Sequence, residues 1–171
     1  KTTEVIYLYQ LDTISVKLSK ITTVKGVINP SFLTLSPNGK YLFACTESKT
    51  KNAGSVSSFE FKPENKTLTF INSQKSGGEN PVFATVHKNG KWLINGNYTE
   101  GSVSVYPISE NGTINTIAQN FQFSEGSVNK ERQDRSHIQS TVITPNFDYV
   151  FLPDLGADKI RCFNYKKKKS E

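Results

Sequence analysis

Hydrophobic and polar residues alternate along most of the chain with a period of two, rather than the 3.6 of a helix. Val103 and Val105, for example, alternate with serines. Such alternation is typical of β-strands that bury one face. Asn38-Gly39 and Asn89-Gly90 separate alternating runs, and they predict tight hairpins because both residue types tolerate a positive φ. We find no segment with a helical pattern, so the sequence predicts an all-β fold.

The alternating runs belong to a repeat that consists of two pieces. The first piece reads Asn-Pro-x-Phe-x-Thr-x-x-x-Asn-Gly-Lys in its two clearest copies. Its three copies, at spacings of 51 and 57 residues, begin at Asn29, Asn80 and, more loosely, His137. The second piece begins at Gly54, Gly101 and Asp158. The opening segment from Val5 matches the second piece without a first piece before it.

Four short antiparallel strands in a unit of about 40 to 57 residues predict one blade of a β-propeller. We expect fourth strands at 68–72 and 114–118. The predicted inventory, within one partial propeller domain (1–165) and before a basic tail (166–171), is a partial blade (4–24), two blades (31–74 and 82–124) and a partial blade (139–165). The alternative, an open β-sandwich, does not explain the repeat.

This inventory amounts to about three and a half blades, whereas propellers close with four to eight. We therefore expect the chain to be a piece of a longer protein, which also agrees with its lack of methionine. Its end blades would expose unpaired sheet edges. The rest of the propeller, or a second chain, would be needed to close the ring.

The formal charge of +6 comes mostly from the end of the chain, where Lys166 to Lys169 supply four of the 21 basic residues. The other 17 basic and the 15 acidic residues nearly cancel. A basic excess confined to one tail does not favour a nucleic-acid partner. No apolar segment is long enough to span a membrane, and no signal-peptide pattern opens the chain. We expect a cytoplasmic location, with a periplasmic or secreted one as the alternative.

The two cysteines, Cys45 and Cys162, both lie in predicted strands and lack the spacing of a metal site. We therefore expect two buried free thiols. The chain also lacks a serine-hydrolase elbow, a zinc motif and a Walker pattern. The sequence accordingly predicts neither a metal nor a cofactor.

Candidate chemistry is concentrated where one copy of the repeat differs from the others. His137 takes the position of Asn29 and Asn80, which we expect to begin an innermost strand near the central channel. The long connection 125–136 precedes it. That connection supplies two cations that suit a carboxylate or phosphate, Arg132 and Arg135, and two orienting carboxylates, Glu131 and Asp134. The alternative is a solvated, charge-balanced loop.

Polar residues also follow the second predicted strand of each blade. Thr46-Glu47, Asn97-Tyr98 and 154–156 occupy equivalent positions, so we expect them to lie on one rim. Asp154 could instead cap a turn. The other histidine, His87, falls in a predicted hairpin tip, where we expect it to be exposed.

Four segments together resemble the lactonase family of seven-bladed β-propellers. They are 29–43, Asn97-Tyr98 before 101–105, Glu131-Arg-Gln ahead of Ser136-His137, and 153–158. The family includes the cycloisomerase-type 6-phosphogluconolactonases and the fungal carboxy-muconate lactonizing enzymes. The resemblance runs along nearly the whole chain and would cover the N-terminal half of a typical member.

The family pattern at the site resembles Pro-His-x-His-Ser after a loop that contains arginine. This chain keeps the first histidine as His137 and has Gln139 in place of the second. The resemblance implies that His137 is the general acid or base, that Arg132 is the cation for a carboxylate, phosphate or oxyanion, and that Glu131 supports them. The candidate substrate-binding residues are Gln139, Asn97, Tyr98, Asp154 and Arg135.

The leading hypothesis is a sugar-lactone hydrolase that acts on 6-phosphogluconolactone. One alternative is a lactonizing cycloisomerase of carboxylated muconate, in which the same residues would serve. A second alternative is a non-catalytic propeller that binds a ligand or protein through its rim. In the first two cases the partner is a small lactone or a carboxylated or phosphorylated molecule.

Overall fold

The computed structural model describes residues 5–48, 54–146 and 149–165. These residues form thirteen strands and no helix. No membrane-spanning helix therefore occurs in this part of the chain. The basic tail predicted at 166–171 lies outside the described residues.

The strands form four antiparallel sheets, each built from consecutive strands. The N-terminal hairpin pairs β1 (Val5–Asp12) with β2 (Lys17–Lys25). The first blade contains β3 (Pro30–Leu35), β4 (Tyr41–Thr46), β5 (Ser55–Lys62) and β6 (Thr67–Lys75). The second blade contains β7 (Pro81–Val86), β8 (Trp92–Asn97), β9 (Ser102–Pro107) and β10 (Gln119–Gln122). The third blade contains β11 (Val142–Ile143), β12 (Tyr149–Asp154) and β13 (Lys159–Asn164).

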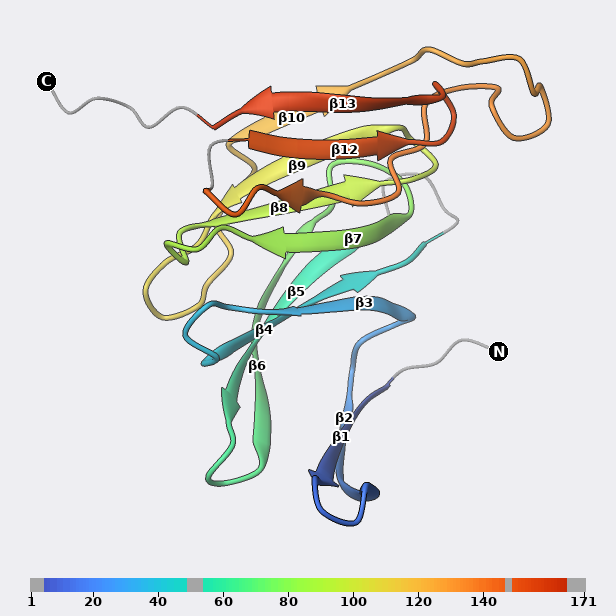
Figure 1. The fold of residues 1–171 in the computed structure, drawn as a ribbon. Helices are drawn as coiled ribbons and strands as arrows, with labels where there is room; N and C mark the ends of the chain where they lie inside the picture. Colours follow the sequence, from blue (N-terminus) through green and yellow to red (C-terminus); the bar gives the residue numbers. More distant parts are fainter. Residues whose placement is uncertain (1–4, 49–53, 147–148, 166–171) are drawn as a thin grey trace, which may run out of the picture.

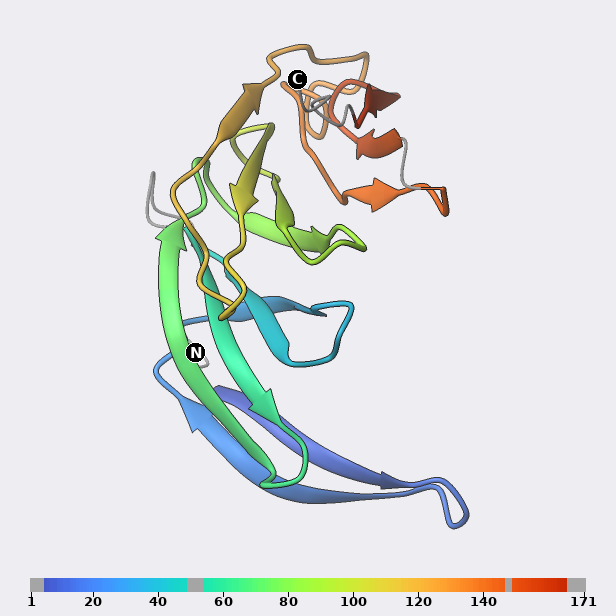
Figure 2. The ribbon, with the colours of Figure 1, turned by 90° about the vertical axis from the view of Figure 1, so that its left-hand side faces the viewer.

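The sheets follow one another like the blades of a fan, as the two perpendicular views show (Figure 1, Figure 2). Within each complete blade the strands lie in chain order, so β3 and β7 begin at one edge and β6 and β10 end at the other. This arrangement confirms the prediction of four-stranded antiparallel propeller blades.

The hairpins within the blades form at the predicted asparagine-glycine pairs. In the turn between β3 and β4, Asn38 Oδ1 accepts hydrogen bonds from Lys40 N and Ser36 Oγ. Gly39 has a φ of 70°, a conformation that a residue with a Cβ rarely adopts. The turn between β7 and β8 repeats this geometry, with Gly90 at a φ of 71°.

The hydrophobic core lies between the blades rather than within them. Aromatic and aliphatic side chains of β4 and β5 meet those of β7, β8 and β9, and the rings of Phe32 and Phe83 lie 4.0 Å apart. A second cluster joins the second blade to the third, where Ile138 and Leu152 are almost fully buried. Each sheet therefore depends on its neighbour for burial of its apolar face.

The fourth strand of the second blade was predicted in the wrong place. The structure has β10 at Gln119–Gln122, beyond the predicted 114–118. Ile114 forms an isolated bridge with Ile108 and is fully buried in the core. Burial of this side chain draws the segment inward, and the edge strand forms only after the chain leaves the core.

The predictions for the cysteines are half correct. Cys45 is buried, and burial raises the pKa of its thiol to about 12, which makes it unreactive at neutral pH. Cys162 is exposed, contrary to prediction. It lies on β13, and within the described residues no further strand covers that side of the third blade.

The prediction that His87 is exposed is wrong. The side chain lies in the β7–β8 hairpin, as expected, but only 3% of its surface is accessible. Its ring stacks on Tyr165 at a centroid distance of 4.4 Å. The segment that follows β13 therefore covers the hairpin tip.

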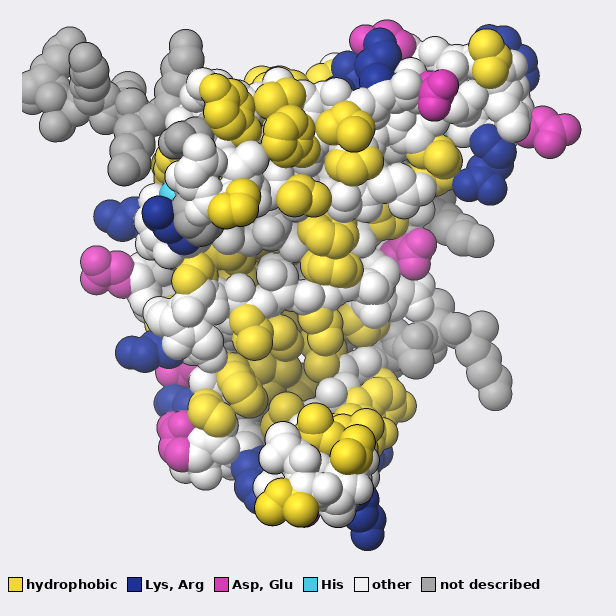
Figure 3. All heavy atoms as spheres, in the orientation of Figure 1, with side chains coloured by type: hydrophobic (Ala, Val, Ile, Leu, Met, Phe, Trp, Pro, Cys, Tyr) yellow, Lys and Arg dark blue, Asp and Glu magenta, His cyan; other side chains and the backbone are white. Residues whose placement is uncertain are grey.

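An apolar surface remains uncovered between β3 and the N-terminal hairpin (Figure 3). Leu33 and Leu35 of β3 are 43% and 51% exposed. The hairpin packs instead against the other strands of the first blade, where Ile6 meets Ala44 and Phe59. The hairpin thus resembles the outer half of a blade whose inner half is not among the described residues.

Replacement of Leu93 by alanine tests the inter-blade core. Leu93 has no accessible surface and packs between the first and second blades. We expect Leu93→Ala to lower the free energy of unfolding by about 2–5 kcal/mol, measured by denaturant titration of the complete protein. Leu93→Met, which conserves volume, should cost less than about 1.5 kcal/mol. Equal stability of parent and Leu93→Ala would contradict this description of the core.

Candidate active site

The site lies where the second strand of each blade ends. β4, β8 and β12 run in the same direction, and their ends lie on one side of the molecule (Figure 1). The residue after each strand donates its backbone N–H to the carbonyl at the start of the repeat. The pairs are Glu47 to Asn29, Tyr98 to Asn80 and Leu155 to His137, at 2.9–3.0 Å. His137 therefore occupies the position that the repeat predicts.

The inner strand of the third blade differs from those of the other two. β3 and β7 begin at the proline directly after Asn29 and Asn80. In the third blade, Ile138 makes only an isolated bridge with Asp154, and β11 begins at Val142. The asparagines have positive φ values of 44° and 61°, whereas His137 does not. His137 thus precedes an interrupted strand, not the continuous one that was expected.

The connection 125–136 folds back on itself before it reaches His137. Gln133 holds it closed through backbone hydrogen bonds with Ser127 and Asn129, and its side-chain amide donates to Leu155 O at 3.0 Å. Gly156 lies under the end of this connection, where any side chain would collide with the carbonyl of Arg135. The loop is therefore packed against the β12–β13 turn.

Asp154, at the end of β12, is a buried carboxylate with four hydrogen-bond donors. It accepts from Ser136 Oγ at 2.6 Å, His137 N at 2.8 Å, Ala157 N at 3.1 Å and Arg161 Nε at 2.8 Å. Burial alone would raise the pKa of Asp154, but these hydrogen bonds outweigh it and leave the pKa below its ordinary value. The residue is 2% exposed and was expected to bind substrate. Its side chain has no exposed surface, although the residue lines a cavity beside the β12–β13 turn.

Arg161 connects Asp154 to the beginning of the same loop. Its guanidinium donates to Glu125 at 2.6 and 3.3 Å as well as to Asp154, and it lies 4.0 Å from the centre of the Phe123 ring. Only 12% of the Arg161 side chain is exposed. These partners come from two segments, the stretch after β10 and the end of β12, so the Arg161 side chain joins the two.

His137 is held on both of its ring nitrogens. Its ring stacks on Tyr98 at a centroid distance of 4.5 Å and an interplanar angle of 14°. Nδ1 lies 3.0 Å from Tyr98 O, and Nε2 lies 3.2 Å from Asp134 Oδ1. A carbonyl and a carboxylate oxygen both only accept, so a neutral ring can donate to one of them and an imidazolium to both. The residue is 9% exposed and faces acceptors on each side.

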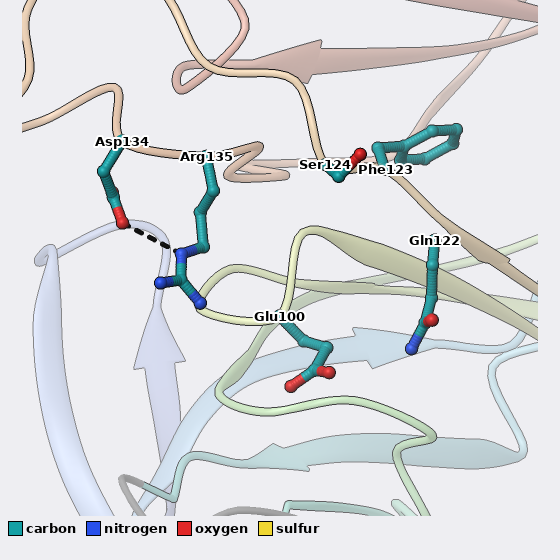
Figure 4. A pocket seen from close by; sticks show the side chains of 6 residues that line it. All are labelled: Glu100, Gln122, Phe123, Ser124, Asp134 and Arg135. Carbon is teal, nitrogen blue, oxygen red and sulfur yellow. Dashed lines mark hydrogen bonds and ion pairs between the residues drawn. The ribbon is translucent and has the colours of Figure 1, made fainter.

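Asp134, which contacts His137 Nε2, lines a cavity of about 520 Å³ together with Arg135. Arg135 Nε donates to Asp134 Oδ2 at 2.9 Å (Figure 4). This hydrogen bond is the main reason that the pKa of Asp134 lies below its ordinary value, and the contact with His137 acts in the same direction. The other lining residues are Glu100, Gln122, Phe123 and Ser124. The cavity is therefore lined by positively charged, negatively charged and neutral polar side chains.

Three of the predicted site residues lie apart from the group around His137. Arg132 and Glu131 are exposed, and in the described part of the chain their side chains make no hydrogen bond or ion pair. Gln139 is exposed and lines a second cavity of about 520 Å³ beside the β12–β13 turn. Among the residues that the structure describes, no group of three side chains that could hold a metal ion occurs.

Asn97 is fully buried, although it was expected to bind substrate. Its amide donates to Ser76 O at 3.1 Å and Ser102 Oγ at 3.0 Å, and its carbonyl oxygen accepts from Asn95 at 2.8 Å. Tyr98, the next residue, is half-buried and contacts His137 with both its ring and its carbonyl. The structure therefore brings together Tyr98, Asp134, Arg135 and His137, with Asp154 beneath them.

Arg161 and Glu125 were not identified from the sequence, although a signal for Arg161 was present. Arg161 takes the place of Ser57 and Ser104 in the second piece of the repeat. The comparison between copies that singled out His137 would also have singled out Arg161. Glu125 lies in an irregular connection, where no repeated position marks it.

Comparison with known proteins identifies the class. The family described as "Lactonase, 7-bladed beta-propeller" matches residues 1–171, so the chain belongs to this family and the resemblance is confirmed. A 6-phosphogluconolactonase of Formosa agariphila is 38% identical over 158 residues, which are 92% of this chain and 45% of that protein.

Solved structures share the fold. A crystal structure of a Bacteroides fragilis protein has a TM-score of 0.88 at 32% identity and covers 94% of this chain and 44% of that one. The periplasmic gluconolactonase PpgL of Pseudomonas aeruginosa has a TM-score of 0.84 at 27% identity, with 95% and 46% covered. The chain thus spans about half the length of the relatives that it matches.

The depressed pKa of Asp154 makes part of the stability dependent on pH. The ionised carboxylate stabilises the folded state above its unfolded pKa of about 3.9, and this contribution is lost as the pH falls through the lower folded pKa. We expect the free energy of unfolding of Asp154→Asn to depend less on pH below about pH 4 than that of the parent. Glu131→Gln, at an exposed carboxylate of the same loop, should follow the parent profile in the same denaturant titrations.

Proposed function

We propose that the complete protein hydrolyses a sugar lactone, with 6-phosphogluconolactone as the leading substrate. The observation that carries this proposal is the nearly buried imidazole of His137, held between Tyr98 and the exposed carboxylate of Asp134. The name of the Formosa agariphila relative supports the choice of substrate. His137 is also one of the residues in which the third blade differs from the shared repeat.

In this reaction the oxygen of water attacks the lactone carbonyl carbon, and His137 Nε2 takes a proton from that water. The bond between the carbonyl carbon and the ring oxygen then breaks, and the leaving oxygen receives the proton. The proposal requires the tautomer in which Nδ1 carries the proton and donates it to Tyr98 O at 3.0 Å, so that Nε2 is the basic nitrogen. A base positioned in this way contributes roughly 10²–10⁴-fold to the rate.

Asp134 serves this step in two ways. Its side chain is 45% exposed, so the carboxylate can turn aside while Nε2 accepts a proton from water. When the imidazolium has formed, the carboxylate at 3.2 Å accepts the Nε2 proton as a hydrogen bond and stabilises the charge. The low pKa of Asp134 keeps the carboxylate ionised at neutral pH, as this role requires.

The cation for the substrate's phosphate, or for the developing oxyanion, is Arg135 in this proposal. Arg135 lines the cavity next to Asp134, and 59% of its side chain is exposed to a ligand. Arg132, which the family resemblance suggested, is retained as the alternative. A guanidinium suits either anion because it offers two parallel donors.

Closure of the ring by the rest of the protein forms part of the proposal. The family is seven-bladed, the chain spans about 45% of its Formosa relative, and apolar residues of β3 are uncovered. Further blades would bury these side chains and surround the rim with additional residues. A second chain is the alternative source of the missing blades.

Substitution of His137 tests the proposed base. In the complete protein, His137→Gln should lower kcat for 6-phosphogluconolactone by about 10²–10⁴-fold, because the glutamine cannot accept the proton from water. Lactone loss, followed as acid release against the uncatalysed background, provides the measurement.

His87→Gln is the matched control, since His87 lies in the β7–β8 hairpin, where its ring stacks on Tyr165. It should retain parental kcat once folding has been verified. Parental activity in His137→Gln would remove His137 from the mechanism. Inactivity of the parent towards sugar lactones would favour the cycloisomerase or the binding protein.

A matched pair of arginine variants separates the two candidate cations. We expect Arg135→Ala to lower kcat/KM by about 10–10²-fold, which is the cost of one lost charge-assisted hydrogen bond, and Arg135→Lys to lower it less. Arg132→Ala should change it by less than about threefold. Steady-state kinetics on the complete protein gives both values, and the reverse order would assign the anion contact to Arg132.

A further inference from the structure

The loop 125–136 is held at both ends by the buried carboxylate of Asp154 and the partly buried guanidinium of Arg161. Glu125, at its beginning, accepts two hydrogen bonds from Arg161. Ser136, at its end, donates to Asp154 at 2.6 Å. Asp154 and Arg161 in turn form an ion pair at 2.8 Å. The two ends of the loop are therefore joined through three charged residues in series.

This ion pair is shielded from water. The Asp154 side chain has no exposed surface, and that of Arg161 is 12% exposed. Removal of one partner from such a pair leaves a buried charge without compensation, which is strongly unfavourable. The contact between Asp154 and Arg161 is therefore costly to break, whereas the contact between Arg161 and Glu125 lies nearer the surface, where the Glu125 side chain is 50% exposed.

Among the three blades, the described residues contain this pair only in the third. Arg161 replaces Ser57 and Ser104, and Asp154 takes the place of Thr46 and Asn97 in the registers of the first two blades. Only the third blade is preceded by the folded connection that ends in His137. The charged pair and the loop therefore occur in the same blade, as expected if the pair holds the loop in place.

The Asp154 carboxylate also holds the backbone of His137, the residue that carries the reactive ring. Asp154 Oδ1 accepts from the backbone N–H of His137 at 2.8 Å, and Oδ2 accepts from the adjoining Ser136 side chain. These contacts fix the backbone of His137, and thus the direction from which its imidazole meets Tyr98. Neither Asp154 nor Arg161 contacts the ring itself.

We propose that Asp154 and Arg161 are positioning residues, which clamp both ends of the loop 125–136 and thereby fix the imidazole of His137 over Tyr98. The catalytic consequence rests on the proposed function, whereas the structural consequence does not. A displacement of about 1 Å at a reacting group can cost about 10²-fold in rate. The clamp therefore predicts a loss in kcat rather than in substrate binding.

The experiment uses the complete protein labelled with ¹³C and ¹⁵N histidine. The ring signal of His137 is assigned by its disappearance in His137→Gln. We expect Arg161→Gln to shift this signal, to weaken the contact between the rings of His137 and Tyr98, and to lower kcat by about 10²-fold while KM changes by less than about threefold. Arg161→Lys, which keeps the charge, should restore part of the kcat.

Two further variants keep the test decisive. Ser136→Ala removes one hydroxyl and no charge, so it carries the test if Arg161→Gln does not fold, and it should lower kcat by about tenfold. Lys159→Gln is the control, because the exposed Lys159 side chain contacts Glu125 at 3.8 Å and, among the described residues, forms no ion pair with Asp154, its backbone partner in the register of β12 and β13. It should leave the His137 signal in place and kcat within about twofold.

The possible outcomes separate the clamp from the proposed function. A folded Arg161→Gln or Ser136→Ala variant with an unmoved His137 signal and kcat within about twofold of the parent would overturn the clamp. A parent without lactonase activity would overturn the proposed function, and the histidine signals alone would then decide the clamp. A shifted His137 signal with a loss of kcat in Arg161→Gln and Ser136→Ala, but not in Lys159→Gln, supports it.

Discussion

The blades depend on one constraint: the segments that cross from sheet to sheet must satisfy their polar groups where water does not reach. In the second blade, Asn97 and Ser104 both donate to the carbonyl of Ser76 on the incoming connection. In the third, Asp154 accepts from Ser136 and from the backbone of His137. In both blades the last residue of the second strand therefore hydrogen-bonds the incoming connection. Asn97 does so with its amide, and Asp154 with its carboxylate.

These two solutions have different physical consequences. The amide of Asn97 bonds only to neutral groups, so the second blade is insensitive to acid at this position. The carboxylate of Asp154 needs Arg161 as a counter-charge, and this requirement brings in Glu125 and the start of the loop. A buried ion pair adds little net stability, but removal of one partner is strongly unfavourable because the other charge then lacks compensation. The third blade thus acquires a fixed loop where the others have a simple crossing.

Local patterns predicted those features that depend on local interactions. The alternation of residues and the asparagine-glycine turns gave strands and hairpins that the structure confirms, because both depend on neighbours in the sequence. The errors occur where distant segments intervene. Ile114 is drawn into the inter-blade core, His87 is covered by Tyr165, and Cys162 lies on a side that no described strand covers.

The sequence by itself determined the blade architecture and the position of His137, because a repeat reveals both what is shared and what one copy changes. Only the tertiary structure decided which loop residue meets the ring. Asp134 does so, while Arg132 remains exposed, since spacing in an irregular loop does not fix the direction of a side chain. It also decided that Arg161 meets Asp154, because the antiparallel register of β12 and β13 makes them diagonal neighbours on one face.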